Sequence, residues 1–309
     1  MPLFIKGVKV EKVPTVDAFV VTYSHFKESS QDLLGQQIRE VGPKGLLYIG
    51  QREVAGTSPA DDVISVLGSE DATTCHIAVL RHSGSGATSL IHFDGSSIPE
   101  GLDTMVSLVK KQTADLSSGR FEVHLVGGFL DPRHNSHEVS DEVLDAMCNN
   151  PNDLHLVTAC ITHFNTTYDE KGVPFPVIYG IACDVKTGEI FRAKFTDKGP
   201  DQSLRSARHF TGGRENIVIY DSESKQLAIG PFGYDQLSNL DVFLSMPNKA
   251  IRQYLSTSPA QEPEGFEENV RASLLQMKNF PNPLSSFFSN GKPRTYKKDP
   301  ETGAWILVQ

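Results

Sequence analysis

The sequence predicts an α+β protein in which largely antiparallel sheets are stacked and helices lie on the outside. Short runs of β-branched and aromatic residues outnumber the amphipathic helical segments. Three pairs of these runs are joined by tight turns that contain Gly, Asp or Ser. Helices do not alternate regularly with strands, which disfavours a doubly wound nucleotide-binding fold. We therefore expect stacked sheets covered by peripheral helices.

The helical segments carry apolar residues at the three-to-four spacing of an amphipathic helix, with polar residues between them. Such a helix can pack its apolar side on a sheet and expose its polar side to solvent, so each helix is expected at the periphery. These segments are residues 27–41, 101–115, 138–149, 201–210 and 266–280.

The strand-like runs dominate the middle of the chain, and turn chemistry predicts three hairpins. The runs are residues 45–50, 62–67, 75–81, 88–93, 121–127, 154–162, 176–184, 189–195, 216–221, 226–230 and 303–308. The turn-linked hairpins span residues 177–195, 217–230 and 295–308.

The chain of 309 residues is expected to form a single domain, 1–309, with 39% hydrophobic residues to build its core. The Pro-rich segment 257–265 is a candidate linker. Only a helix and a hairpin follow it, so we expect this tail to pack on the main body.

Composition also narrows the classes of function. A formal net charge of -9 provides no positive field for a nucleic acid or an anionic membrane surface. No signal-peptide pattern and no long apolar run occur, so we expect a cytoplasmic, and also nuclear, protein. We also expect a monomer. The four cysteines are far apart and lack paired CxxC spacing, which argues against a zinc site and a disulfide framework and predicts free thiols. We expect no metal and no cofactor.

Residues 63–95 carry the groups best suited to catalysis. Cys75 follows a polar loop and opens an apolar strand, a position at the mouth of a cleft. His92 ends the next strand, seventeen positions later, after the glycine-rich reversal SGSGA. Two antiparallel strands joined by this turn would bring His92 beside Cys75.

A cysteine and a histidine in contact form an apparatus for cleaving an amide. An imidazole beside a thiol favours the thiolate, which attacks the amide carbon. The protonated imidazole of His92 then donates to the departing ammonia and later activates water. The backbone N–H groups of Thr74 and Cys75, at the junction of loop and strand, are candidates to stabilise the oxyanion.

A third polar group is needed to hold the imidazole in a productive tautomer. Ser69, at the end of the preceding strand, is our prediction for this position, and Asp94 and Asp71 are acidic alternatives.

Structural interpretations compete with this hypothesis. A cysteine at the start of a strand is more often a small buried apolar residue. His76 should point away from Cys75, and Gly127-Gly128 is interpreted as a turn rather than a phosphate-binding loop. The other cysteines are interpreted as core thiols: Cys148, Cys160 and Cys183.

At LGSEDATTCHIAVLRHSGSGATSLIHFDG the sequence resembles the eukaryotic protein N-terminal asparagine amidohydrolase family. The resemblance extends over nearly the whole chain, through VGPKGLLYIGQRE, FEVHLVGGF, FPVIYGIA, LRSAR and YKKD. It implies deamidation of an N-terminal asparagine of a protein or peptide to aspartate, which feeds the N-degron pathway.

The resemblance also implies a fold and a set of catalytic residues. That family is similar to bacterial cysteine deamidases, whose fold is an α-β-β sandwich with Cys, His and a hydroxyl residue. The hydroxyl residue lies six positions before the cysteine and the histidine seventeen after it, which matches Ser69, Cys75 and His92 and favours Ser69 over Asp94.

Recognition of an N-terminal asparagine requires a partner for its α-ammonium group, because an unpaired buried charge is costly. Glu70, Asp71 and Asp94 are the nearby acids, and we rank Asp71 and Asp94 first. Glutamine differs by one methylene, worth only about 1–3 kcal/mol in apolar recognition, so selectivity requires a closed pocket.

Two other functions remain open. One is a deamidase or transglutaminase-like enzyme that acts on internal glutamines with the same nucleophile and base. The other is a non-catalytic interaction module in which Cys75 is buried and inert.

Overall fold

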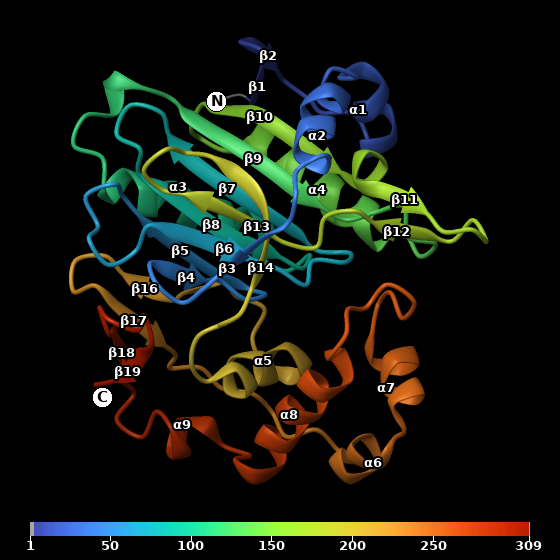
Figure 1. Ribbon diagram of the computed structural model, residues 1–309, viewed down its shortest axis with the longest axis vertical. Helices are drawn as coiled ribbons and strands as arrows, with labels where there is room; N and C mark the ends of the chain where they lie inside the picture. The colour runs from blue at the N-terminus through green and yellow to red at the C-terminus, as the bar shows by residue number, and fades with distance from the viewer. Residues whose placement is uncertain (1–2, 309) are drawn as a thin grey trace.

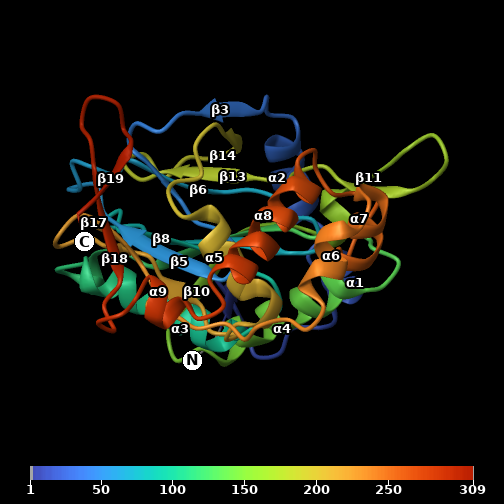
Figure 2. The same ribbon diagram turned by 90° about the horizontal axis from the view of Figure 1, so that it is seen from below.

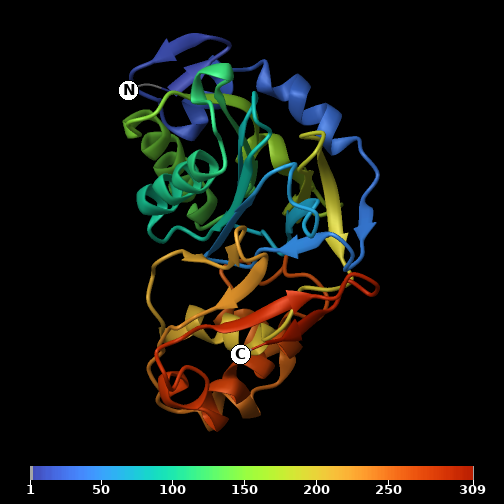
Figure 3. The ribbon, with the colours of Figure 1, turned by 90° about the vertical axis from the view of Figure 1, so that its left-hand side faces the viewer.

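The computed structural model describes residues 3–308 and confirms the α+β class (Figure 1). An eight-stranded sheet and a five-stranded sheet lie face to face, and helices cover the outer face of the larger sheet (Figure 2). The last third of the chain lies below these layers in the view of Figure 3.

The eight-stranded sheet has the order β15-β5-β8-β7-β9-β10-β1-β2. Its strands are β1 (Leu3–Ile5), β2 (Val8–Val10), β5 (Glu53–Thr57), β7 (His76–His82), β8 (Thr88–Phe93), β9 (Phe121–Gly127), β10 (Leu154–Ile161) and β15 (Ile217–Val218). β7 is antiparallel to both β8 and β9, whereas β10 is parallel to both β9 and β1. The sheet is therefore mixed.

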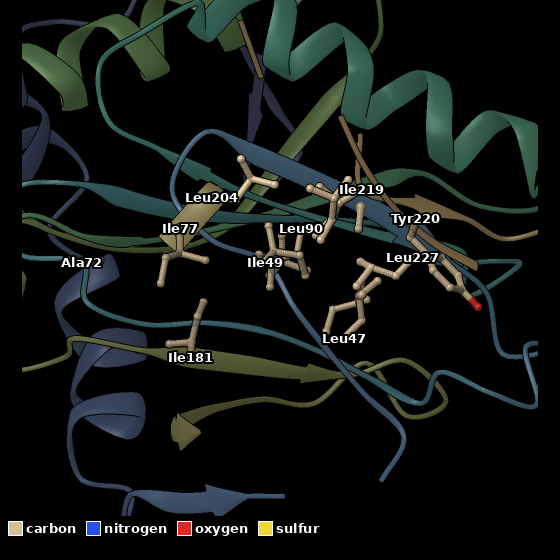
Figure 4. Packing of buried hydrophobic residues seen from close by; sticks show 14 of the residues in the cluster. Leu47, Ile49, Ala72, Ile77, Leu90, Ile181, Leu204, Ile219, Tyr220 and Leu227 are labelled. Atoms are coloured by element: carbon tan, nitrogen blue, oxygen red, sulfur yellow. The ribbon is translucent and has the colours of Figure 1, made fainter. Parts of the chain in front are cut away.

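The five-stranded sheet has the order β3-β14-β13-β6-β4. Its strands are β3 (Arg39–Val41), β4 (Leu46–Tyr48), β6 (Val66–Ser69), β13 (Ile181–Asp184) and β14 (Ile190–Phe195). Apolar side chains from both sheets fill the space between them, with Ile77 and Leu90 on one side and Leu47 and Ile181 on the other (Figure 4). This core fixes how the two sheets face each other.

The opposite face of the eight-stranded sheet is covered by α3 (Ile98–Lys111) and α4 (Asn135–Asn149). Leu102 and Met105 of α3 are buried in one cluster with Ile91 and Phe93 of β8. The remaining elements before residue 200 are α1 (Val16–Thr22), α2 (Phe26–Leu34), η1 (Leu116–Ser118), η2 (Thr162–Asn165), β11 (Thr166–Tyr168) and β12 (Pro174–Pro176).

The C-terminal part combines a four-stranded sheet with five helices. Its elements are α5 (Gln202–Thr211), β16 (Tyr220–Asp221), β17 (Gln226–Ile229), α6 (Leu240–Ser245), α7 (Asn248–Leu255), α8 (Phe266–Asn279), α9 (Pro283–Ser286), β18 (Arg294–Lys298) and β19 (Trp305–Leu307). Leu204 of α5 and Leu274 of α8 belong to the same apolar cluster as the inter-sheet residues. A buried ion pair between Arg205 and Glu53 also joins α5 to β5.

The three predicted hairpins are confirmed as β13–β14, β16–β17 and β18–β19. The predicted helix 27–41 is wrong beyond Leu34, because residues 39–41 extend as β3 and pair with β14. The strand predicted at residues 62–67 lies further along the chain, as β6 at Val66–Ser69. The strand β5 was not predicted. No helix within residues 3–308 is both long and apolar enough to cross a membrane.

Candidate active site

The hairpin of β7 and β8 places Cys75 and His92 on one face of the eight-stranded sheet. Ile77 pairs with His92, and paired residues in a ladder point to the same side. Cys75 precedes Ile77 by two positions and so shares that face. His76 points the opposite way, where its Nε2 lies 2.8 Å from Ser140 Oγ on α4. The predicted alternation is confirmed.

Ser69 reaches His92 from the other sheet. Its hydroxyl Oγ lies 2.8 Å from His92 Nδ1, and both residues are buried. Ser69 is the last residue of β6, so the contact joins the end of β6 in one sheet to β8 in the other. Within residues 3–308, His92 Nε2 has no hydrogen-bond partner. The imidazole is therefore held at one nitrogen and available at the other.

Cys75 lies at the border of the inter-sheet core, half-buried rather than sealed in it. Its carbonyl accepts a hydrogen bond of 2.9 Å from Gly128 N. Gly127 and Gly128 have φ of 137° and 64°, and a Cβ on Gly127 would lie 2.4 Å from the Cys75 carbonyl oxygen. The glycine pair is thus a turn that allows close approach to Cys75, as predicted.

The N–H groups of Thr74 and Cys75 donate no hydrogen bond to another group of the described chain. They lie at the junction of loop and strand, immediately beside the thiol. Two free donors in this position could bind an oxyanion.

Burial sets the protonation states of the cysteine and histidine pair. Burial, reinforced by the Asp94 and Glu262 carboxylates, raises the pKa of the Cys75 thiol. Burial lowers the pKa of His92 to about 4. At neutral pH the resting pair is a thiol and a neutral imidazole, so the nucleophile requires His92 as a base during attack.

The two acids ranked first for substrate binding already have cationic partners. Asp94 accepts from Arg52 Nε at 2.5 Å and from Gln51 Nε2 at 2.7 Å. Asp71 accepts from Lys198 Nζ at 2.6 Å. Lys198 also pairs with Glu70, the third acid of this loop.

The site has a further wall that sequence reasoning missed. Thr257, in the Pro-rich segment 257–265, has its Oγ1 3.1 Å from Thr74 Oγ1. Glu262 of the same segment acts electrostatically on the Cys75 thiol. The sequence held no signal for this contact, because the two segments are separated by 183 positions.

The other three cysteines are buried core thiols, as predicted: Cys148, Cys160 and Cys183. Elsewhere in residues 3–308, one group of side chains has the spacing of metal ligands, namely Asp17, His137 and His163. None of the three belongs to the Cys75 loop.

The chain matches known proteins over nearly its whole length. Residues 36–307 match the family model described as protein N-terminal asparagine amidohydrolase. Proteins of that name from Homo sapiens and Mus musculus are each 44% identical to the chain over 308 residues, covering 100% of this chain and 98% of each relative. The protein of that name from Arabidopsis thaliana is 25% identical over 284 residues, 84% of this chain and 80% of the relative. The chain therefore belongs to the protein N-terminal asparagine amidohydrolase family.

Proposed function

We propose that this protein removes the side-chain amide of an asparagine at the N-terminus of a protein or peptide, leaving aspartate and releasing ammonia. The family relationship supports this reaction. The observation that carries it is the contact between Ser69 and His92, which leaves His92 Nε2 free on the face that bears Cys75.

The reaction begins with a neutral imidazole. In the productive tautomer, His92 Nδ1–H donates to Ser69 Oγ, and Nε2 accepts the thiol proton as sulfur attacks the amide carbon. The N–H groups of Thr74 and Cys75 stabilise the oxyanion that forms. The imidazolium then donates its proton to the leaving nitrogen, so that ammonia departs and a thioester remains.

Hydrolysis of the thioester uses the same groups in reverse order. Neutral His92 takes a proton from water, and the resulting hydroxide attacks the thioester carbon. The carbon–sulfur bond breaks, and the imidazolium returns its proton to sulfur. The carboxylic acid that forms then loses its own proton to solvent, and the product leaves as a carboxylate. The cycle needs no cofactor.

The wider role follows from the product. An aspartate at the N-terminus feeds the N-degron pathway, which places the enzyme in the cytoplasm and also in the nucleus. The three layers of helices and sheets support a likeness to the α-β-β sandwich of bacterial cysteine deamidases. We also expect a monomer that binds neither nucleic acid nor membrane.

Mass spectrometry of an Asn-start peptide tests the reaction. Wild type should convert the amide to a carboxylate, and Cys75→Ala should lower the rate by at least about a thousandfold. Cys148→Ala, which removes a thiol distant from the Cys75 loop, should keep the activity. Equal activity of wild type and Cys75→Ala would falsify the cysteine mechanism.

An acetylated peptide separates this function from its alternative. An N-terminal deamidase should not act on acetyl-Asn peptides, whereas an internal glutamine deamidase should act on internal Gln with or without acetylation. Activity on internal Gln and none on Asn-start peptides would favour the alternative.

A further inference from the structure

The segment 256–262 forms part of the surface around Cys75. Thr257 Oγ1 lies 3.1 Å from Thr74 Oγ1, and Ser258 and Gln261 are buried. Gln261 Nε2 donates to the Pro174 carbonyl at 2.7 Å, which fixes the segment beside β12. The end of this segment, Glu262, is therefore held at a defined place near the nucleophile.

Glu262 carries a half-buried carboxylate in this segment. Ser256 Oγ donates a hydrogen bond to one carboxylate oxygen. Burial, reinforced by Asp71, raises the pKa of Glu262 to about 7, although the Ser256 hydrogen bond and the Arg252 charge oppose the shift. The carboxylate also contributes to the raised pKa of the Cys75 thiol and of Tyr179, so it lies within electrostatic reach of both groups.

Other acids around Cys75 have cationic partners, but Glu262 does not. Asp94 is paired with Arg52, and Asp71 with Lys198. Within residues 3–308, no lysine or arginine side chain forms a salt bridge with the Glu262 carboxylate. The site therefore contains one carboxylate that lacks a cation.

The nearby arginine is committed elsewhere. Arg252 donates to both carboxylate oxygens of Glu267, at 2.6 and 3.0 Å. Its Nη1 donates to the backbone carbonyl of Glu262 at 2.8 Å, not to the side chain. Arg252 thus positions the segment and acts on the Glu262 carboxylate only from a distance, without forming an ion pair with it.

We propose that the Glu262 carboxylate binds the α-ammonium group of the substrate's first residue. This inference rests on the proposed function and adds the group that recognises a free N-terminus. In asparagine, the α-nitrogen and the amide carbon are only roughly 3–4 Å apart. One pocket can therefore place the ammonium on Glu262 and the amide carbon at the Cys75 sulfur.

The Glu262 carboxylate and the Cys75 sulfur are both fixed, so they also select for the length of the substrate side chain. Glutamine has one more methylene, so with its ammonium on Glu262 the amide carbon is displaced by roughly 1.5 Å from the sulfur. A displacement of this size costs about a hundredfold in rate at a rigid site. The same carboxylate thus explains both the need for a free amine and the preference for asparagine.

Glu262→Gln tests this assignment because it preserves shape and removes the charge. With Asn-start peptides, kcat/KM should fall roughly a hundredfold, mostly through KM, since an ion pair within the site is lost. Glu262→Asp should recover part of the loss. Glu264→Gln, a change at an exposed neighbour, serves as the matched control and should resemble wild type.

A peptide whose first residue is des-amino asparagine separates binding from structural damage. Wild type and Glu262→Gln should act on it at equal rates, both well below the wild-type rate with the Asn-start peptide, because it has no ammonium to bind. An equal loss with both peptides, or no loss with either, overturns the assignment. If wild type itself leaves Asn-start peptides unchanged, the proposed function fails and the assignment fails with it.

A second, independent observation concerns Asp17 of α1, His137 of α4 and His163 of η2. The Nε2 atoms of His137 and His163 lie 3.3 and 3.4 Å from the same oxygen, Asp17 Oδ1. All three ligand atoms lie within 4.8 Å of one another. In the described chain, neither contact has the alignment of a hydrogen bond, so the two nitrogens converge on a shared region.

These separations fit a tetrahedral metal ion. Zinc bonds to nitrogen and oxygen of about 2.0–2.1 Å place neighbouring ligand atoms about 3.4 Å apart. Imidazole nitrogen and carboxylate oxygen are both ordinary zinc ligands. Asp17 is mostly exposed, which leaves room for water as a further ligand.

We propose that Asp17, His137 and His163 form a site for a divalent transition metal ion such as Zn²⁺. The absence of paired cysteines in the sequence does not bear on it, because all its ligands are nitrogen or oxygen and come from three separate elements. The ion would join α1 to α4 and η2. It has no part in the proposed deamidation.

Titration with Co²⁺ tests the site by its absorption spectrum. Wild type should show the visible bands of four-coordinate Co²⁺ without a sulfur charge-transfer band. His163→Ala and Asp17→Asn should weaken binding at least about tenfold, while His25→Ala, at a histidine outside the cluster, should not. Equal binding by all variants, or a sulfur band, overturns the proposal.

Discussion

Ser69 Oγ lies 2.8 Å from His92 Nδ1, and the two residues belong to different sheets. The orientation of the imidazole therefore depends on how the two sheets are stacked. The Ser69 hydroxyl is the group through which the position of the five-stranded sheet affects the orientation of His92, the proposed base.

Ser69→Ala should reduce kcat roughly tenfold to a hundredfold, because the imidazole loses the partner that fixes its tautomer. KM should change little, since Ser69 is fully buried behind His92. Steady-state kinetics with an Asn-start peptide measures both values. Ser89→Ala is the matched control, because Ser89 is equally buried but bonds Met105 O under α3. Equal effects of the two changes would contradict a role in positioning.

The Cys75 thiol should remain protonated at neutral pH in the free enzyme. Burial and the nearby carboxylates raise its pKa, whereas an ordinary thiol titrates near about 8.5. The ultraviolet absorbance difference between wild type and Cys75→Ser reports thiolate directly. We expect no thiolate signal at pH 7 and a signal only above the ordinary range. A thiolate signal at pH 6 would show a resting ion pair instead.

Acid should destabilise the fold through buried histidines. Burial lowers the pKa of His76 to about 3 and of His92 to about 4, below the unfolded value of about 6.5. As pH falls below about 6.5, the unfolded chain binds protons that the folded chain excludes, so stability decreases. The slope is about 1.4 kcal/mol per pH unit for each histidine.

Urea unfolding from pH 7.5 to 4.5 measures this dependence, with a flat contribution from these groups above about pH 6.5. His124 and His209, whose pKa values burial also lowers to about 4, add to the total slope. His76→Gln should therefore reduce the total slope by about 1.4 kcal/mol per pH unit. A slope unaffected by His76→Gln would contradict the prediction.

Gly127→Ala should damage both stability and activity. The residue has a φ of 137°, and its new Cβ would lie 2.4 Å from the Cys75 carbonyl oxygen. We expect a loss of about 1–3 kcal/mol in unfolding free energy together with a lower kcat, because the Cys75 backbone must shift. Gly172→Ala is the control, with a φ of 75° and open space around it, and should cost about 1 kcal/mol without affecting kcat.

The local parts of the fold were predictable from sequence because their signals are local. The turn SGSGA and the flanking alternation correctly predicted the hairpin that carries Cys75 and His92. Spacing along a strand also predicted that His76 would point away. Each inference needed only residues that are neighbours in the sequence.

The remaining features depend on distant partners. Residues 39–41 look helical in sequence but extend because β14 offers a parallel edge. β5 was not predicted because its sequence, EVAGT, contains a glycine and lacks a clear alternation of apolar and polar residues. The contact of Thr257 with Thr74 of the Cys75 loop was not predictable for the same reason, since no pattern within 257–265 refers to that loop.

The contact of Thr74 with Thr257 has a consequence for the newly made chain. The hairpin that bears the nucleophile is synthesised 183 positions before Thr257 arrives to cover its loop. A chain that has been synthesised only as far as residue 256 lacks Thr257 and Glu262, so its Cys75 loop is without this wall. The surroundings of the thiol are therefore complete only after the last fifth of the chain has been made and has docked.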